Sequence, residues 1–146
     1  MAATAIYLNF NRETEDAFNF YKSIFGGEFI GEINRLSTVP PQEGQPPIAQ
    51  SDGNLVMHIQ LKLPGGVDLH GSDAPETMGF KINKGNNSYI FINLDTREEA
   101  DQLFAKLSVD GKIEMPMTDM FWGDYFGSFA DKYGTSWMIS CPSKKV

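Results

Sequence analysis

The feature that most constrains the fold of this chain is an internal repeat, because one pattern of apolar and polar residues occurs twice. The first copy runs from Tyr7 to Gly27, and a weaker copy runs from Ile90 to Gly111. In both copies a short apolar segment precedes apolar side chains spaced three or four residues apart, and glycine follows. This pattern is typical of a strand followed by a helix. A repeated supersecondary unit limits the possible folds more than local propensity does.

Each predicted helix has one apolar face. The apolar positions recur at the i, i+3, i+4 spacing that places side chains on one side of a helix, and Gly26 stops the first helix. We expect both faces to pack in the core, because apolar stripes of this kind are usually buried. They consist of Ala17, Phe20, Tyr21, Ile24 and Phe25 in the first helix, and of Ala100, Leu103, Phe104 and Leu107 in the second.

Each half of the chain also ends in a predicted hairpin, with Gly66 or Gly134 at its turn. Glycine tolerates the positive φ that such turns require. With one more strand after each helix, both halves become a strand, a helix and three strands. The fold class is therefore predicted as α+β, built from two βαβββ modules. The last three strands are expected at residues 28–36, 55–63 and 67–72 in the first half, and at 112–117, 125–130 and 135–140 in the second.

Short motifs follow one another in a fixed order along nearly the whole chain. They are Tyr7-Leu8, Phe10-Asn11, Glu15, Ala17, Phe20-Tyr21, Phe25-Gly26-Gly27, Met57-His58, Ser72-Asp73-Ala74-Pro75, Gly85-Asn86-Asn87, Phe121-Trp122-Gly123-Asp124, Gly127-Ser128-Phe129, Gly134 and Trp137-Met138-Ile139. This ordered set resembles the vicinal oxygen chelate superfamily, which includes glyoxalases, ring-cleaving dioxygenases and bleomycin-binding proteins. Within that superfamily it resembles the PhnB-like branch.

The resemblance implies one glyoxalase/bleomycin-resistance-like domain over residues 1–146, with modules at about 1–73 and 88–142. Its eight strands would form one incomplete barrel or two cupped, mixed β-sheets, with the helices on the outer face. Relatives cover an exposed sheet edge with a partner chain, so we expect a homodimer. Residues 37–53 and 73–87 are predicted loops, and the second is either a plain linker or a lid or interface segment.

Composition argues against some partners and compartments. The chain has 12 basic and 19 acidic residues and a formal charge of −7, which disfavours nucleic acid and anionic membrane surfaces. Cys141 is the only cysteine, so no intramolecular disulfide is possible. Neither a signal peptide nor a membrane helix is visible, and the cytoplasm is the default expectation.

The hairpin in the first half is expected to have one apolar and one polar face, because its residues alternate with period two. If Leu63 pairs with Val67, His70 lies opposite Gln60, and His58 lies diagonally at roughly 7–8 Å between backbones. In the resembled family this polar face lines the cleft. The two histidines would share a ligand or a water, or His58 would be a solvated strand residue.

Aromatic and apolar side chains are expected on the same cleft face, and Trp122 precedes the seventh strand where it could close over that face. Aromatic walls with a few polar groups are typical of small-molecule pockets. The candidate ligand-binding residues are Tyr7, His58, Gln60, His70, Tyr89, Phe91, Trp122, Phe126 and Met138.

Metal-dependent members of the resembled family hold their ion with four side chains, one each from the first and last strand of each module. Aligning the two halves places these positions at Ala5, His70, Tyr89 and Met138. Only His70 is an ordinary ligand, and one imidazole leaves too few donors for a catalytic metal. We therefore expect neither a metal nor another cofactor.

Three functions remain open from the sequence. The favoured one is a metal-free, dimeric PhnB-like protein that binds a small molecule. The second is a glyoxalase- or dioxygenase-type enzyme, with a relocated metal near His58 and His70 or with His70 and Asp68 as acid–base groups. The third is an interaction protein with a vestigial cleft. PhnB-like chains are sometimes labelled demethylubiquinone methyltransferases, but no Rossmann-type glycine-rich turn is present here to hold S-adenosylmethionine.

Overall fold

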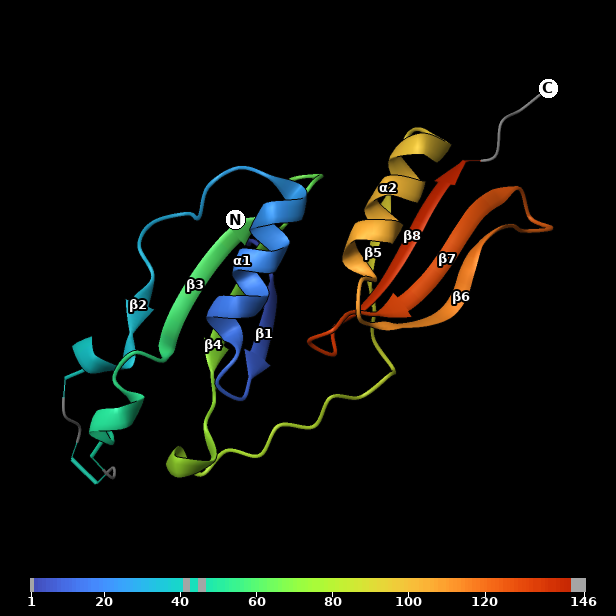
Figure 1. Ribbon diagram of the computed structural model, residues 1–146. Coiled ribbons are helices and arrows are strands. Elements are labelled where there is room, and N and C mark those ends of the chain that lie inside the picture. The colour runs from blue at the N-terminus through green and yellow to red at the C-terminus, as the bar shows by residue number, and fades with distance from the viewer. Residues whose placement is uncertain (1, 41–42, 45–46, 143–146) are drawn as a thin grey trace. The chain divides into compact units, whose positions relative to one another are not determined.

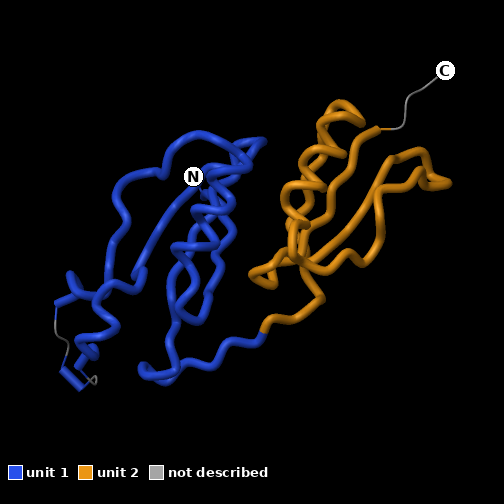
Figure 2. Tube along the Cα trace, in the orientation of Figure 1, with its two compact units in different colours: residues 1–83 blue, residues 84–146 orange. Residues whose placement is uncertain are grey.

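The computed structural model describes residues 2–40, 43–44 and 47–142. The chain divides into two compact units, Met1–Asn83 and Lys84–Val146 (Figure 2). Each unit is a mixed four-stranded sheet with one α-helix packed against it (Figure 1). The predicted α+β fold of two βαβββ modules is confirmed, and the described strands form two sheets and no closed barrel. That the two units act as one domain stays a prediction.

The sheet of the first unit has the strand order β1-β4-β3-β2. Strands β1 and β4 are parallel, whereas β3 runs antiparallel to both of its neighbours. Among the described residues of this unit, three short 3-10 helices lie in the connections. The elements are β1 (Ile6–Phe10), α1 (Thr14–Phe25), β2 (Asn34–Arg35), η1 (Leu36–Thr38), η2 (Gln50–Asp52), β3 (Val56–Lys62), β4 (Asp68–Asp73) and η3 (Glu76–Met78).

The second unit repeats this topology with the strand order β5-β8-β7-β6. Its first and last strands, β5 and β8, are again parallel, and the other pairs are antiparallel. None of the helices in the described ranges is long and apolar enough to cross a membrane. The elements are β5 (Ile90–Asn93), α2 (Arg97–Leu107), β6 (Lys112–Asp119), β7 (Asp124–Ala130) and β8 (Ser136–Pro142).

The strand predicted at residues 28–36 is much shorter in the structure. Strand β2 contains only Asn34–Arg35, and one isolated bridge joins Phe29 to Leu61. Gly31 lies between them with φ of 72°, a left-handed conformation that interrupts an extended strand. The two halves of the repeat therefore differ most at the strand that follows the helix.

The buried face of α1 is rotated relative to the predicted one. Ala17 and Tyr21 are buried as expected, but the fully buried phenylalanine is Phe18, and Phe20 is partly exposed. Phe18 lies against Gly71 of β4, where an added Cβ would stand 2.5 Å from the ring. Because glycine leaves room for the ring, the helix packs closely on the sheet at this point.

The two helices begin with different caps. In α2 the Thr96 hydroxyl accepts a hydrogen bond from the backbone amide of Glu99 at 3.1 Å, and it donates to the Glu99 carboxylate at 3.0 Å. Thr96 is therefore a local N-cap. In α1 the backbone amide of Thr14 donates instead to Asp73 at 3.1 Å, at the far end of β4. The first helix is thus capped from a distant part of the chain.

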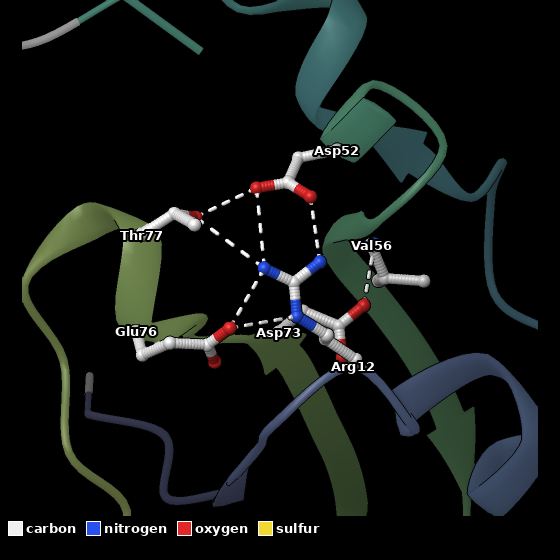
Figure 3. A network of polar contacts seen from close by, with 6 residues as sticks. All are labelled: Arg12, Asp52, Val56, Asp73, Glu76 and Thr77. Carbon is white, nitrogen blue, oxygen red and sulfur yellow. Dashed lines mark hydrogen bonds and ion pairs between the residues drawn. The ribbon is translucent and has the colours of Figure 1, made fainter. Parts of the chain in front are cut away.

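A network around Arg12 joins the β1–α1 loop to two of the 3-10 helices (Figure 3). Arg12 Nη1 donates to Asp52 Oδ1 at 2.6 Å, and its Nη2 donates to Glu76 Oε1 at 3.0 Å. The Thr77 hydroxyl donates to Asp52 Oδ2 at 2.6 Å. Asp52 is only 2% exposed, so Arg12 supplies the positive charge that makes its burial tolerable.

Replacing Arg12 with glutamine is expected to destabilise the first unit and to change its response to acid. The hydrogen bond from Arg12 lowers the pKa of the Asp52 carboxyl. The stabilisation is therefore present above the ordinary carboxyl pKa of about 4, and it is lost as pH falls through the lower folded value. Arg12→Gln should lower the urea midpoint at pH 7. Below pH 5 the midpoint of the variant should decrease less with falling pH than the midpoint of the wild type.

The control for this prediction is Arg35→Gln, because Arg35 pairs with Glu15 in a comparable two-bond geometry at 2.8 and 2.9 Å. Glu15 is 40% exposed, so water can replace the lost partner. The control should shift the midpoint less. Equal urea midpoints for the two variants at pH 7 would contradict the role given to Arg12.

Candidate functional site

The candidate residues of the first unit lie on the face of its sheet opposite α1. Gly71 faces Phe18 of the helix, so its neighbour His70 points to the other face. In the sheet His70 pairs with Gln60 on one side and with Tyr7 on the other. The pairing of His70 with Gln60 agrees with the register predicted from the sequence, and Tyr7 joins the same row.

Three of these side chains form what we call the Tyr7–His58–His70 cluster. His58 Nε2 and His70 Nδ1 lie 2.7 Å apart, which is a direct hydrogen bond between the two rings. The Tyr7 ring stacks on His70, with centroids 5.9 Å apart and an interplanar angle of 10°. The histidines therefore bond to each other directly, without a water between them.

Strand β3 departs from the predicted alternation at its beginning. Period-two alternation predicts Met57 on the apolar face of the hairpin, but it is 43% exposed, whereas the preceding Val56 is buried. The pairing with β2 shifts here, since Asn34 pairs with His58 and the next residue, Arg35, pairs with Val56. An irregular register of this kind turns a side chain away from its expected face. Regular alternation starts at His58.

The surroundings of the cluster favour an uncharged His58 ring. Partial burial and the proximity of His70 lower the pKa of His58. Asp68, next to His70 on the same face, accepts hydrogen bonds from Gln60 at 2.9 Å and from Lys62 at 3.1 Å. The bond from Lys62 lowers the pKa of the Asp68 carboxyl. Gln60 is thus engaged with Asp68 and sits beside the cluster.

In the second unit, Phe91, Met138 and Ser128 lie side by side in one row of the sheet. This row faces away from α2, because the neighbouring Gly127 points toward Phe104 of that helix. Phe91 is exposed and Met138 is half-buried. Together they give this unit an accessible apolar surface.

The turn between β6 and β7 carries two exposed aromatic rings. Trp122 contacts Phe126 edge to face at 6.3 Å between ring centroids, and its indole N–H donates to Asp124 Oδ2 at 3.0 Å. The adjacent Phe121 is 96% exposed and contacts Trp122 at 5.1 Å. Sequence reasoning selected Trp122 and Phe126 but passed over Phe121, although the adjacent aromatic pair Phe121-Trp122 was the available signal.

Tyr89 directly precedes β5 and bonds to β6, the strand at the opposite edge of the same sheet. Its hydroxyl donates to Glu114 Oε1 of β6 at 2.8 Å. This hydrogen bond raises the pKa of the Tyr89 phenol. The phenolate that a metal would need is therefore disfavoured at this position.

The sequence-predicted residues thus fall into two groups, one in each unit. The first unit brings together Tyr7, His58 and His70, with Gln60 beside them. The second unit contains the apolar residues of the prediction. That these residues bind a ligand stays a prediction. The second group consists of Phe91, Trp122, Phe126 and Met138, with Tyr89 bonded to β6.

The residues present do not fit the four-ligand metal site of the resembled superfamily. On the sheet, the residue paired with His70 is Tyr7 and not the expected Ala5, and the residue paired with Met138 is Phe91 and not the expected Tyr89. A phenylalanine and a thioether are poor ligands for a hard divalent ion. Within the described ranges, no group of three or more His, Cys, Asp or Glu side chains is arranged to hold an ion.

A family model described as 3-demethylubiquinone-9 3-methyltransferase matches residues 2–140 of the chain. The chain belongs to this family. Among curated relatives, Protein YjdN of Escherichia coli strain K12 is 30% identical over 140 residues, which cover 92% of this chain and 91% of that protein. The family thus accounts for nearly the whole sequence, including both units.

Solved structures of this family and of the wider superfamily share the fold. A putative 3-demethylubiquinone-9 3-methyltransferase, PhnB protein, from Bacillus cereus superposes with a TM-score of 0.72 at 28% identity, covering 96% of this chain and 99% of that one. A glyoxylase/bleomycin resistance protein/dioxygenase domain from Frankia sp. EAN1pec has a TM-score of 0.62 at 10% identity, covering 97% and 98%. The PhnB-like resemblance and its place in the superfamily fold are therefore confirmed.

Proposed function

We propose that this PhnB-like chain binds a small organic molecule and does so without the divalent metal of its superfamily. The Tyr7–His58–His70 cluster carries the proposal. Its rings offer a flat aromatic surface and ring nitrogens that can form hydrogen bonds. They lie on a half-buried sheet face, and ligand sites use this mixture of apolar and polar groups. The apolar row of the second unit supplies a second surface of suitable character.

The methyltransferase activity in the family description is not what the residues support. Rossmann-type folds hold their cofactor at a glycine-rich turn after the first strand. Here β1 is followed by Asn11-Arg12-Glu13, and β5 is followed by Leu94-Asp95-Thr96. We therefore place ligand binding ahead of methyl transfer.

An enzyme with a relocated metal near His58 and His70 is the second candidate function, and the closeness of the two imidazoles favours it. Two imidazoles alone are an incomplete ligand set. A native mass spectrum of the purified protein tests both functions at once. A carried-through organic molecule supports the binding protein, whereas one divalent ion per chain supports the enzyme.

We also propose a homodimer, because large apolar side chains such as Phe91, Phe121 and Trp122 are more than half exposed. Exposed apolar surface of this kind often marks an interaction site. Light scattering at micromolar concentration should give twice the mass of one chain. A mass of one chain would contradict the dimer and leave the binding proposal intact.

Replacing His70 with alanine is expected to weaken ligand binding and to change stability little. His70 makes one side-chain hydrogen bond and is only half-buried, so the loss should stay within about 1 kcal/mol. Affinity for the best compound from a thermal-shift screen should decrease at least tenfold.

The matched control is Ser72→Ala, two residues along β4 on the same face, where the hydroxyl donates to Asn9 at 3.0 Å. It should leave the affinity within about twofold, because Ser72 is outside the cluster. If instead the protein purifies with a stoichiometric divalent ion that His70→Ala loses, the metal-free proposal is wrong.

A further inference from the structure

Ser128 of β7 is a buried polar side chain on the open face of the second sheet, the face directed away from α2. It is only 6% exposed, although α2 packs on the opposite face. Its neighbours along the strand, Gly127 and Phe129, lie toward α2, where Phe129 contacts Phe104 at 4.9 Å between ring centroids. Ser128 is therefore recessed among the larger side chains of its own face.

Apolar side chains lie on both sides of Ser128 across the sheet. Met138 of β8 and Met115 of β6 are paired with it, and Phe91 of β5 is paired with Met138. We call these four residues the Ser128 row. Phe91 is 56% exposed and Met115 is 40% exposed. An accessible phenyl ring with two thioethers suits an aromatic ligand, because rings pack well on one another and on sulfur.

The Ser128 hydroxyl has no hydrogen-bond partner among the residues that the structure describes. Every fully buried side-chain oxygen of these residues does have a partner, so the Ser128 oxygen still reaches solvent. A hydroxyl can donate or accept a hydrogen bond. A ligand that covered the row without bonding this hydroxyl would leave it unpaired, which is costly in a desolvated site. The row therefore favours a ligand with a group that forms a hydrogen bond here.

The Ser128 row carries no charge of its own. On β6, Glu114 accepts the hydrogen bond from Tyr89, and Lys112 lies opposite Ala130, outside the row. An ionised ligand would lose water on this surface and find no opposite charge in the row. Because burying an unpaired charge is unfavourable, the row favours an uncharged ligand.

We propose that the Ser128 row binds an uncharged aromatic ring that carries one hydrogen-bonding substituent, as a phenol does. The ring packs on Phe91, Met115 and Met138, and its substituent bonds the Ser128 hydroxyl. Ser128 thus sets the specificity for a polar substituent, and the apolar residues supply the contact area. This inference rests on the proposed binding function and names a ligand class for the second unit.

The test compares four toluenes with different para substituents: 4-methylphenol, 1,4-dimethylbenzene, 4-methylbenzoate and 4-methylbenzylammonium. Each is titrated at pH 7.5 into the full-length protein, labelled with ¹³C at the methionine methyl groups. We expect 4-methylphenol to shift the NMR signals of Met115 and Met138 and to bind at least about fivefold more tightly than the other three. Met57 of the first unit and Met117, which lies toward α2, are internal references.

Ser128→Ala removes a hydroxyl without breaking a hydrogen bond to a described residue, so the variant should fold. It should abolish the preference for 4-methylphenol over 1,4-dimethylbenzene. The matched control is Ser136→Ala, which is 8% exposed on the same face but pairs with Ala130 outside the row. This control should preserve the preference. Loss of the preference in Ser136→Ala but not in Ser128→Ala would overturn the role of Ser128.

Two failures are distinguishable. If 4-methylphenol binds no more tightly than the other probes, or shifts neither Met115 nor Met138, the ligand class is wrong and the proposed binding function stands. If neither the probes nor the compounds from the thermal-shift screen perturb these methionines or the rings of His58 and His70, the proposed function itself is wrong.

Discussion

Replacing Asp131 with alanine should lower the free energy of unfolding by about 4 kcal/mol, a large share of the stability of a small domain. Asp131 is buried in the β7–β8 turn and accepts three hydrogen bonds. They come from the backbone amides of Tyr133 and Thr135 at 2.8 and 3.1 Å, and from the buried indole of Trp137 at 2.8 Å. Alanine removes both carboxylate oxygens that accept these hydrogen bonds. Urea denaturation followed by tryptophan fluorescence measures the effect.

Two further variants provide an intermediate case and a control for this prediction. Asp131→Asn retains one carbonyl acceptor and should fall between the wild type and alanine. Lys132→Ala, at the exposed neighbouring position, should change stability by no more than about 0.5 kcal/mol. If Asp131→Ala is as stable as Lys132→Ala, the hydrogen bonds of Asp131 do not stabilise the second unit.

Replacing Asp73 with alanine should cost about 3 kcal/mol, because this buried carboxylate joins three elements of the first unit. Its Oδ1 accepts from the amide and the hydroxyl of Thr14 at 3.1 and 2.8 Å, and its Oδ2 accepts from the amide of Val56 at 2.8 Å. Asp68→Ala is the control on the same strand, since its partners lie near solvent. Circular dichroism during thermal unfolding should show a clear decrease in Tm for Asp73→Ala alone.

The sequence was sufficient to predict the duplicated topology, because periodicity and glycine positions survive in both copies. It was insufficient for the strand after α1, where the left-handed Gly31 interrupts pairing. It also placed Phe20 rather than Phe18 in the core. The reason is that the buried face of α1 depends on Gly71, which lies far along the chain and matches a helical ring only in three dimensions.

The sequence likewise predicted some features of the candidate site and not others. Strand alternation correctly placed His58, Gln60 and His70 on one face, because the turn at Gly66 sets the register of the hairpin. The rotamers that bring two imidazole nitrogens to 2.7 Å depend on packing across strands, which alternation does not determine. The buried carboxylates Asp52, Asp73 and Asp131 were also missed as structural groups, since an aspartate in a loop, at a strand end or in a turn gives no sequence signal of burial.

The different caps of the two helices have a consequence for the order in which the chain folds. The Thr96 cap of α2 joins residues three positions apart, whereas the Asp73 cap of α1 closes a loop of 59 residues. Local contacts form before distant ones, because loop closure costs entropy first. We expect α2 to be structured in the folding transition state and the start of α1 to form later. Thr96→Ala should then mainly slow folding, and Asp73→Ala should mainly accelerate unfolding, as stopped-flow chevron plots would show.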